Sequence, residues 1–110
     1  MIRYRKGELF NLIIKEIYFG FIRIHILHHA QKEPVYGLWL IEELRRHGYK
    51  LSPGTLYPIL HKMQRDNHIK SYPVLVDGRI RKYYKITPKG RKSLTEAKKK
   101  VQELIKEIEE

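Results

Sequence analysis

The chain has 110 residues, no cysteine, and 23 lysine and arginine residues against 12 aspartate and glutamate residues, which gives a net charge of +11. This length fits one domain with a modest core, and the lack of cysteine excludes disulfides, thiolate metal sites and a cysteine nucleophile. The excess of positive charge favours a polyanionic partner such as nucleic acid, although a well-charged surface or adaptation to high temperature would also explain it. The lack of cysteine fits a reducing compartment, so we expect a cytoplasmic protein.

An amphipathic helix is predicted for residues 8–30, with an apolar surface wider than one small domain can easily cover. Its main stripe consists of Leu9, Ile13, Ile17, Gly20, Ile24 and Leu27, and the stripe is widened by Phe10, Ile14, Tyr18, Phe21 and Ile22. We expect part of this surface to face a second subunit, and Gly20 to allow another helix to approach closely. Lys15, Glu16 and Arg23 interrupt the apolar run, which argues against a membrane span.

Two histidines, His25 and His29, stand four residues apart in this helix, a spacing that can bind zinc. The sequence places no convincing third ligand, because Glu33 precedes Pro34 and is expected to lie outside the helix. We therefore favour histidines whose charge suits the end of a helix over a metal site, and we expect neither a metal nor a cofactor.

Two further helices are predicted to follow, joined by a short turn. The first of them, "PVYGLWLIEELRRHGY", opens at Pro34 and closes at Gly48. Its core face is expected to consist of Leu38, Ile41 and Leu44. The next, "LSPGTLYPILHKMQRDNHI" (residues 51–69), has Ser52 at the N-cap position. Its apolar face consists of Leu56, Ile59, Leu60 and Met63. This pair indicates a helix-turn-helix, although any helical hairpin shows a similar pattern.

The helix within residues 51–69 contains two residues, Gly54 and Pro58, that weaken a helix interior. We interpret both as shape matched to DNA: the glycine leaves the backbone open to the sugar-phosphate, and the proline offers a flat apolar contact in the groove. The outer face of the helix consists of Thr55, Tyr57, Pro58, His61, Lys62 and Arg65. A recognition helix presents such a face to base edges and phosphates, but Lys62 and Arg65 would equally suit a solvated surface.

The run "KSYPVLVDGRIRKYYKIT" predicts a β-hairpin, because Asp77-Gly78 favours a type I′ turn between two β-rich segments. Pro73 suits an edge strand, and Tyr83 or Tyr84 is expected in the core. The basic residues flanking the turn are Arg79, Arg81 and Lys82. A basic hairpin directly after a helix-turn-helix is expected to be a wing, whose two arginines contact the minor groove or phosphate.

The last predicted helix opens at Thr87-Pro88, an N-cap followed by proline at the first position. Its apolar residues recur every three or four positions, at Leu94, Ala97, Val101, Leu104 and Ile108. This spacing is that of a coiled-coil seam, but it covers fewer heptads than a secure assignment needs. We favour dimerisation over packing back on the same domain, because the first helix also has apolar surface to spare. We thus expect a DNA-binding unit in residues 1–87 and a dimerisation helix in residues 88–110.

The motifs "LSPGTLYPILHKM" and "RKYYKIT", the latter followed by "KG", are specific in combination. With "YGLWLIEELRR" before them, they make residues 36–94 resemble the PadR family of bacterial and archaeal transcriptional regulators, in particular its branch with a short C-terminal helix. The resemblance implies a mainly α fold with a small β-hairpin, a winged helix-turn-helix flanked by N- and C-terminal helices that form a homodimer. It also implies binding of double-stranded operator DNA, usually as a repressor, and for some members release by a small aromatic or drug-like effector bound between subunits.

The resemblance further implies which residues contact DNA. They are Tyr36, Ser52, Gly54, Thr55, Tyr57, His61, Arg79, Arg81 and Lys82, and Lys62 joins them from the outer face of its helix. Ser52 would be a helix cap first, and Tyr57 could instead pack on the wing. The candidate effector-binding residues are Phe10, Tyr18, Phe21 and Trp39. Plain core or dimer packing explains these aromatic residues as well.

No enzyme activity is expected, because the sequence holds no phosphate loop, no nucleophile motif and no facing pair of carboxylates. We expect a sequence-specific dimeric transcriptional regulator, most simply a repressor, whose palindromic operator spans successive major grooves. Two alternatives stay open. A nonspecific architectural DNA-binding protein would also explain the charge, and a winged helix could bind protein instead, although the wing arginines count against this.

Overall fold

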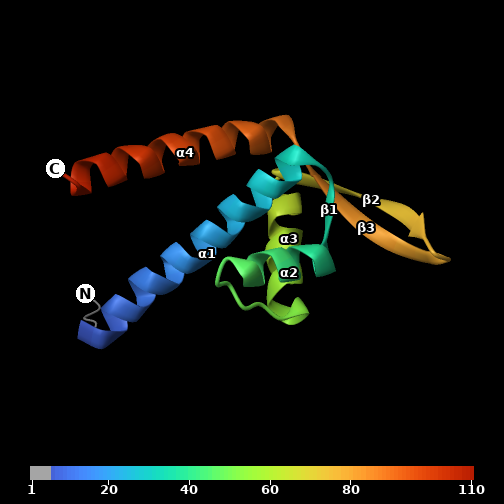
Figure 1. The fold of residues 1–110 in the computed structure, drawn as a ribbon, viewed down its shortest axis with the longest axis horizontal. Coiled ribbons are helices and arrows are strands. Elements are labelled where there is room, and N and C mark those ends of the chain that lie inside the picture. Colours follow the sequence, from blue (N-terminus) through green and yellow to red (C-terminus); the bar gives the residue numbers. More distant parts are fainter. Residues whose placement is uncertain (1–5) are drawn as a thin grey trace.

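The computed structural model describes residues 6–110, with side chains described from residue 11 onward. The elements are α1 (Lys6–Lys32), β1 (Val35–Tyr36), α2 (Gly37–Arg46), α3 (Pro53–Arg65), β2 (Ile69–Val76), β3 (Arg79–Ile86) and α4 (Pro88–Ile108). The hairpin of β2 and β3 projects to one side of the molecule, while α1 and α4 extend to the other side (Figure 1). The predicted class, a mainly α winged helix-turn-helix with a small β-hairpin, is confirmed.

The hairpin belongs to a three-stranded antiparallel sheet with the strand order β1-β3-β2. Its turn residues Asp77 and Gly78 have φ angles of 50° and 77°, the positive values that a type I′ turn requires. β2 is an edge strand, and Pro73 lies in it, where a missing N–H is tolerated. The predicted turn and the predicted edge position are both confirmed.

β1 corrects the predicted second helix. The sequence pattern places residues 34–36 in that helix, but Val35 and Tyr36 form a strand opposite Tyr84 and Tyr83 of β3. The backbone of Tyr36 is extended, with φ −124° and ψ 162°, a conformation that β-branched and aromatic residues favour when they pack on a sheet. As a result, α2 begins only at Gly37.

The core lies between the C-terminal half of α1, the inner faces of α2 and α3, and the sheet. Its fully buried side chains are Ile22, Ile26, Leu40, Leu44, Leu56, Leu60, Ile69 and Tyr84. The predicted core face of α3 is confirmed, with Ile59 half-buried at its margin. In α2 the prediction is wrong for Leu38, which is 60% exposed, whereas Leu40 is buried. Leu38 stands three residues before Ile41 and Leu40 stands four residues before Leu44. Both are helical spacings, so periodicity in so short a helix cannot choose between the two residues.

Among the described side chains of α1 (residues 11–32), only those in the C-terminal half are buried by the rest of the chain. Its buried side chains are Ile22, Ile26, Leu27 and Ala30, and its exposed apolar side chains are Leu12, Ile13, Ile14, Ile17 and Phe21. A Cβ on Gly20 would meet nothing within 4 Å, so no described element of the chain approaches this glycine closely. Among residues 6–110, no helix is long and apolar enough to cross a membrane.

α4 begins with the predicted cap. Thr87 Oγ1 accepts a hydrogen bond from the Gly90 N–H at 3.0 Å and donates one to the carbonyl oxygen of Asn67 at 2.6 Å. A Cβ on Gly90 would overlap the carbonyl oxygen of His68, so the first turn of α4 lies directly against the segment between α3 and β2. These contacts fix the direction in which α4 leaves the sheet.

The apolar residues of the predicted seam in α4 become more exposed toward the C-terminal end of the helix. Leu94, Ala97 and Val101 are half-buried, and α4 contacts α1. Leu104 and Ile108 are 57% and 72% exposed. The distal turns of α4 thus expose apolar side chains, as the first half of α1 does, and the two helices separate toward the termini (Figure 1).

Candidate nucleic-acid interface

The start of α2, one side chain of α3 and the wing surround a surface hollow of about 600 Å³. Its lining includes five of the predicted DNA-contacting residues: Tyr36, Tyr57, Arg79, Arg81 and Lys82. They come from three elements that are distant in the sequence. The β1–β3 pairing brings Tyr36 to the wing residues, and the contact of Tyr57 with Gly37 adds α3. The hollow is therefore rich in cationic and aromatic groups, which suits phosphate and sugar contacts.

Tyr57 packs against the start of α2. A Cβ on Gly37 would overlap its hydroxyl group and ring, so this glycine is required by close contact within the chain. Tyr57 is half-buried in this position, and its ring also borders the hollow beside the wing. The tyrosine therefore fixes α3 against α2 and also presents one edge to the hollow.

A stack of aromatic rings crosses the sheet and holds Arg81. The Arg81 Cζ atom lies 4.0 Å from the centroid of the Tyr36 ring, a cation–π contact. Tyr36 packs edge-on against Tyr83 at 5.4 Å between centroids, and Tyr83 stacks with Tyr72 at 6.2 Å. These three tyrosines are direct cross-strand neighbours. The guanidinium is thus positioned by a rigid surface, whereas Arg79 and Lys82 are exposed near the turn.

The N-terminus of α3 is open on its outer side. Ser52 occupies the predicted N-cap position, but its side chain makes no capping hydrogen bond, and its Oγ lies 3.3 Å from Thr55 Oγ1 instead. The predicted capping interaction is therefore wrong, although the position is right. A Cβ on Gly54 would meet only Ser52 Oγ, at 3.7 Å. Packing within the described chain does not require this glycine, so its free backbone is available to an external group such as a phosphate.

The outer face of α3 continues the same surface. Pro58, His61 and Lys62 are exposed on it, as is Arg65 near its end. Pro58 lies inside the helix, where it removes the donor that would otherwise pair with the Gly54 carbonyl. The predicted DNA-contacting residues of α3 thus form one exposed strip, and Tyr57 connects this strip to the hollow.

The aromatic residues predicted to bind an effector lie in different places. Trp39 packs edge-on against His29 at 5.3 Å and lines a small hollow of about 230 Å³. Tyr18 packs against Phe19 and Tyr49, with ring centroids 5.4 and 5.1 Å apart. Phe21 is exposed, and the side chain of Phe10 lies outside the described residues. Neither Tyr18 nor Phe21 lines the hollow that Trp39 lines.

The fold adds a third histidine to the pair in α1. His47, at the C-cap of α2, places a ring nitrogen within 4.8 Å of nitrogens of both His25 and His29. Burial and the neighbouring His47 lower the pKa of His25, and burial and the neighbouring His28 lower the pKa of His29. Both shifts favour the neutral imidazole, the form with a free lone pair.

Comparison with known proteins agrees with this geometry. The family model described as the transcriptional regulator PadR-like family matches residues 26–96. "Transcriptional regulator Rv3488" of Mycobacterium tuberculosis is 51% identical over 87 residues, 79% of this chain and 81% of that protein. The chain belongs to the PadR family. Two crystal structures of PadR-like proteins have TM-scores of 0.77. The one from Bacteroides fragilis is 30% identical and covers 87% of this chain and 94% of its own. The one from Bacillus cereus is 33% identical and covers 84% and 92%.

Membership of the PadR family assigns the general function. The protein is a DNA-binding transcriptional regulator with a winged helix, and this class of protein is not enzymatic. The basic wing and the open N-terminus of α3 are the parts of the PadR fold that suit this function.

Sequence reasoning missed the tyrosine stack and the third histidine. The turn at residues 77–78 pairs Val76 with Arg79, and counting back along both strands pairs Tyr72 with Tyr83. The turn alone therefore predicts that Tyr72 lies opposite Tyr83. Tyr36 joins the stack only because β1 pairs with β3. His47 had no local signal, because its approach to α1 depends on how α2 packs.

Proposed function

We propose that this PadR-family regulator is a homodimer that binds a palindromic operator sequence-specifically and represses transcription. The observation that carries the proposal is the division of the molecule into two sides. The wing projects to one side of the molecule, and the long helices α1 and α4 extend to the other (Figure 1). The basic hollow is lined by wing residues, whereas the exposed apolar residues belong mostly to α1 and α4. One side suits DNA and the other suits a second subunit.

On the DNA side, α3 enters the major groove with its N-terminus foremost, so that Gly54 and Thr55 lie nearest the backbone and bases. Lys62 and His61 contact the flanking phosphates, and the wing places Arg81 at the minor groove or the adjacent backbone. Because Arg81 rests on the Tyr36 ring, less side-chain freedom is lost when it binds.

On the other side, the dimer forms through the exposed apolar residues of α1 and the distal turns of α4. Leu104 and Ile108 belong to this surface, so residues 88–110 act as the dimerisation helix and residues 1–87 carry DNA binding. A two-fold axis through this contact would present two copies of α3 to successive major grooves about 34 Å apart.

An effector would act through the same side of the molecule. A groove of about 670 Å³ lies between α1 and α4, and Ile24, Leu94 and Val101 contribute to its lining. This volume is within the range of small-molecule sites. A ligand that binds one separation of the two recognition helices better than another would shift operator affinity. Tyr18 does not line this groove. If Tyr18→Ala impairs only the dimer and leaves binding of an added small aromatic ligand unchanged, Tyr18 serves packing and not effector binding.

Selection from a random duplex library at about 0.15 M salt tests the proposal. An enriched inverted repeat would support a site-specific dimer, and in vitro transcription from a template bearing that repeat would then test repression. DNA retained without an enriched sequence would favour the architectural alternative, in which phosphate contacts and deformability supply the affinity. No retention would favour a winged helix that binds protein.

A further inference from the structure

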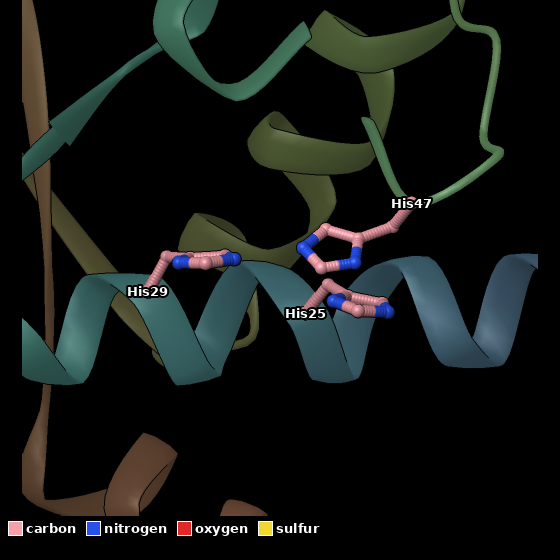
Figure 2. A group of neighbouring side chains, drawn as sticks. All are labelled: His25, His29 and His47. Carbon is pink, nitrogen blue, oxygen red and sulfur yellow. The ribbon is translucent and has the colours of Figure 1, made fainter. Parts of the chain in front are cut away.

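Three histidine rings meet where the end of α2 crosses α1. His25 and His29 stand one turn apart on α1, and His47 extends toward them from the end of α2 (Figure 2). The His25 and His47 ring centroids are 5.0 Å apart, and those of His29 and His47 are 6.3 Å apart. Each residue offers a ring nitrogen within 4.8 Å of the other two.

One of these nitrogens lacks the hydrogen bond that its burial demands. The Nε2 atom of His29 is buried and has no hydrogen-bond partner among the described residues. Buried polar atoms in folded proteins are nearly always paired, so an orphan of this kind calls for an explanation such as an ion. Figure 2 shows a nitrogen of the His29 ring directed toward the other two histidines, which is where an ion would bind.

We propose that His25, His29 and His47 bind a divalent transition-metal ion of the zinc class, joining α1 to the C-terminal end of α2. Three imidazoles with one open position suit zinc, nickel and cobalt better than the hard cations magnesium and calcium, which prefer oxygen ligands. The chain contains no cysteine, so no thiolate competes for the ion.

The geometry requires a small closure. Tetrahedral Zn–N bonds of about 2.0–2.1 Å place ligand nitrogens roughly 3.3 Å apart, so the rings must approach by up to about 1.5 Å. His47 is exposed at the helix end, where a side-chain torsion change meets little resistance. The ring centroids of His25 and His29 are also 6.3 Å apart, so these two side chains must turn toward the ion as well as His47.

Glu43 provides the supporting carboxylate. Its Oε1 lies 3.3 Å from His47 Nε2, and its side chain is only 15% exposed. A hydrogen bond from Nε2 to this carboxylate would fix the ring orientation of a His47 that binds the ion through Nδ1. Carboxylate–histidine–metal chains of this kind are common around zinc.

Trp39 makes the site measurable. It is the only tryptophan of the chain, and its ring centroid lies 5.3 Å from that of His29. A paramagnetic ion at the three histidines would therefore quench its fluorescence, whereas zinc would not. The experiment titrates tag-free full-length protein with Ni²⁺, follows Trp39 emission, and then adds Zn²⁺ as a competitor.

We expect saturable quenching in the micromolar range that Zn²⁺ reverses. His47→Gln and His29→Gln should each weaken Ni²⁺ binding at least about tenfold, and Glu43→Gln should weaken it by about the same factor or less. His28→Gln is the matched control, because His28 neighbours His29 but lies outside the cluster. His47 is exposed, so its variant should melt at the wild-type temperature without metal, which excludes misfolding as the cause.

Two results would overturn the proposal. One is the absence of saturable quenching in the wild type, and the other is an equal loss of binding in His28→Gln and His47→Gln. Neither readout involves DNA, so the site stands or falls independently of the proposed repressor function.

Discussion

Gly54→Ala should separate the stability of α3 from its function. An added Cβ would meet only Ser52 Oγ at 3.7 Å, so the chain has room for it. Alanine is a better helix former than glycine, and the variant should gain up to about 1 kcal/mol in the free energy of unfolding. If the open backbone at Gly54 approaches a phosphate, the same methyl group should weaken operator binding.

The expected loss of DNA affinity is that of one hydrogen bond to a charged group in each subunit. Such a bond contributes about 1.5–3 kcal/mol, so each half-site should lose roughly tenfold to a hundredfold in affinity. Fluorescence anisotropy with the selected operator duplex would measure the affinity, and urea denaturation would measure the stability. The dependence of affinity on salt should keep its slope, because no cation is removed.

Gly37→Ala is the matched control for this variant. Its Cβ would overlap the Tyr57 ring, so it should destabilise the protein by about 1–3 kcal/mol. If Gly54→Ala binds the operator within twofold of the wild type, the glycine does not serve DNA contact. If it unfolds more easily than the wild type, the reading of the space around Gly54 is wrong.

Three further predictions concern the contact of Arg81 with the Tyr36 ring, the buried Tyr84 hydroxyl and the proposed dimer. Arg81→Lys should weaken operator binding severalfold, because a lysine does not stack on the Tyr36 ring as a guanidinium does; unchanged anisotropy titrations would contradict this. Tyr84→Phe should raise the free energy of unfolding by about 1 kcal/mol in urea melts, because the buried Tyr84 hydroxyl has no partner among the described residues. Burial raises the pKa of Tyr84, so above pH 10.0 the unfolded chain releases the Tyr84 proton more readily than the folded chain does. The wild type therefore loses stability there, and the stability advantage of the variant should grow. Ile108→Glu should shift sedimentation toward the monomer, whereas Leu75→Glu, an equally exposed apolar site in the wing, should not.

The elements that sequence predicts correctly are those set by local chemistry. Asp77-Gly78 forms a turn because few other pairs tolerate two positive φ angles, and Thr87 caps α4 because its hydroxyl lies near the next N–H groups. The position of Pro73 in an edge strand also follows from local chemistry, because proline lacks the N–H that a central strand needs. Each of these signals lies within a few positions of the feature it determines.

The parts that sequence fails to predict depend on contacts between distant segments. β1 exists because β3 offers Tyr83 and Tyr84 as partners, and the core face of α2 is decided by how the helix packs. The contact of Arg81 with the Tyr36 ring likewise needs β1 to pair with β3. Such contacts have no local pattern, so a sequence motif can indicate the residues of the interface without their arrangement.

Gly37 and Gly54 show where this limit bears on function. Both glycines stand in the first turn of a helix, and in sequence both would be read as costs to helix formation. The structure separates them: Tyr57 occupies the space beside Gly37, whereas the space beside Gly54 is open. A glycine that weakens its helix serves the fold when a neighbouring side chain needs its space, as Tyr57 does at Gly37. Gly54 has no such neighbour and lies at an uncapped helix N-terminus beside a basic wing, so we expect a partner outside the chain to contact it.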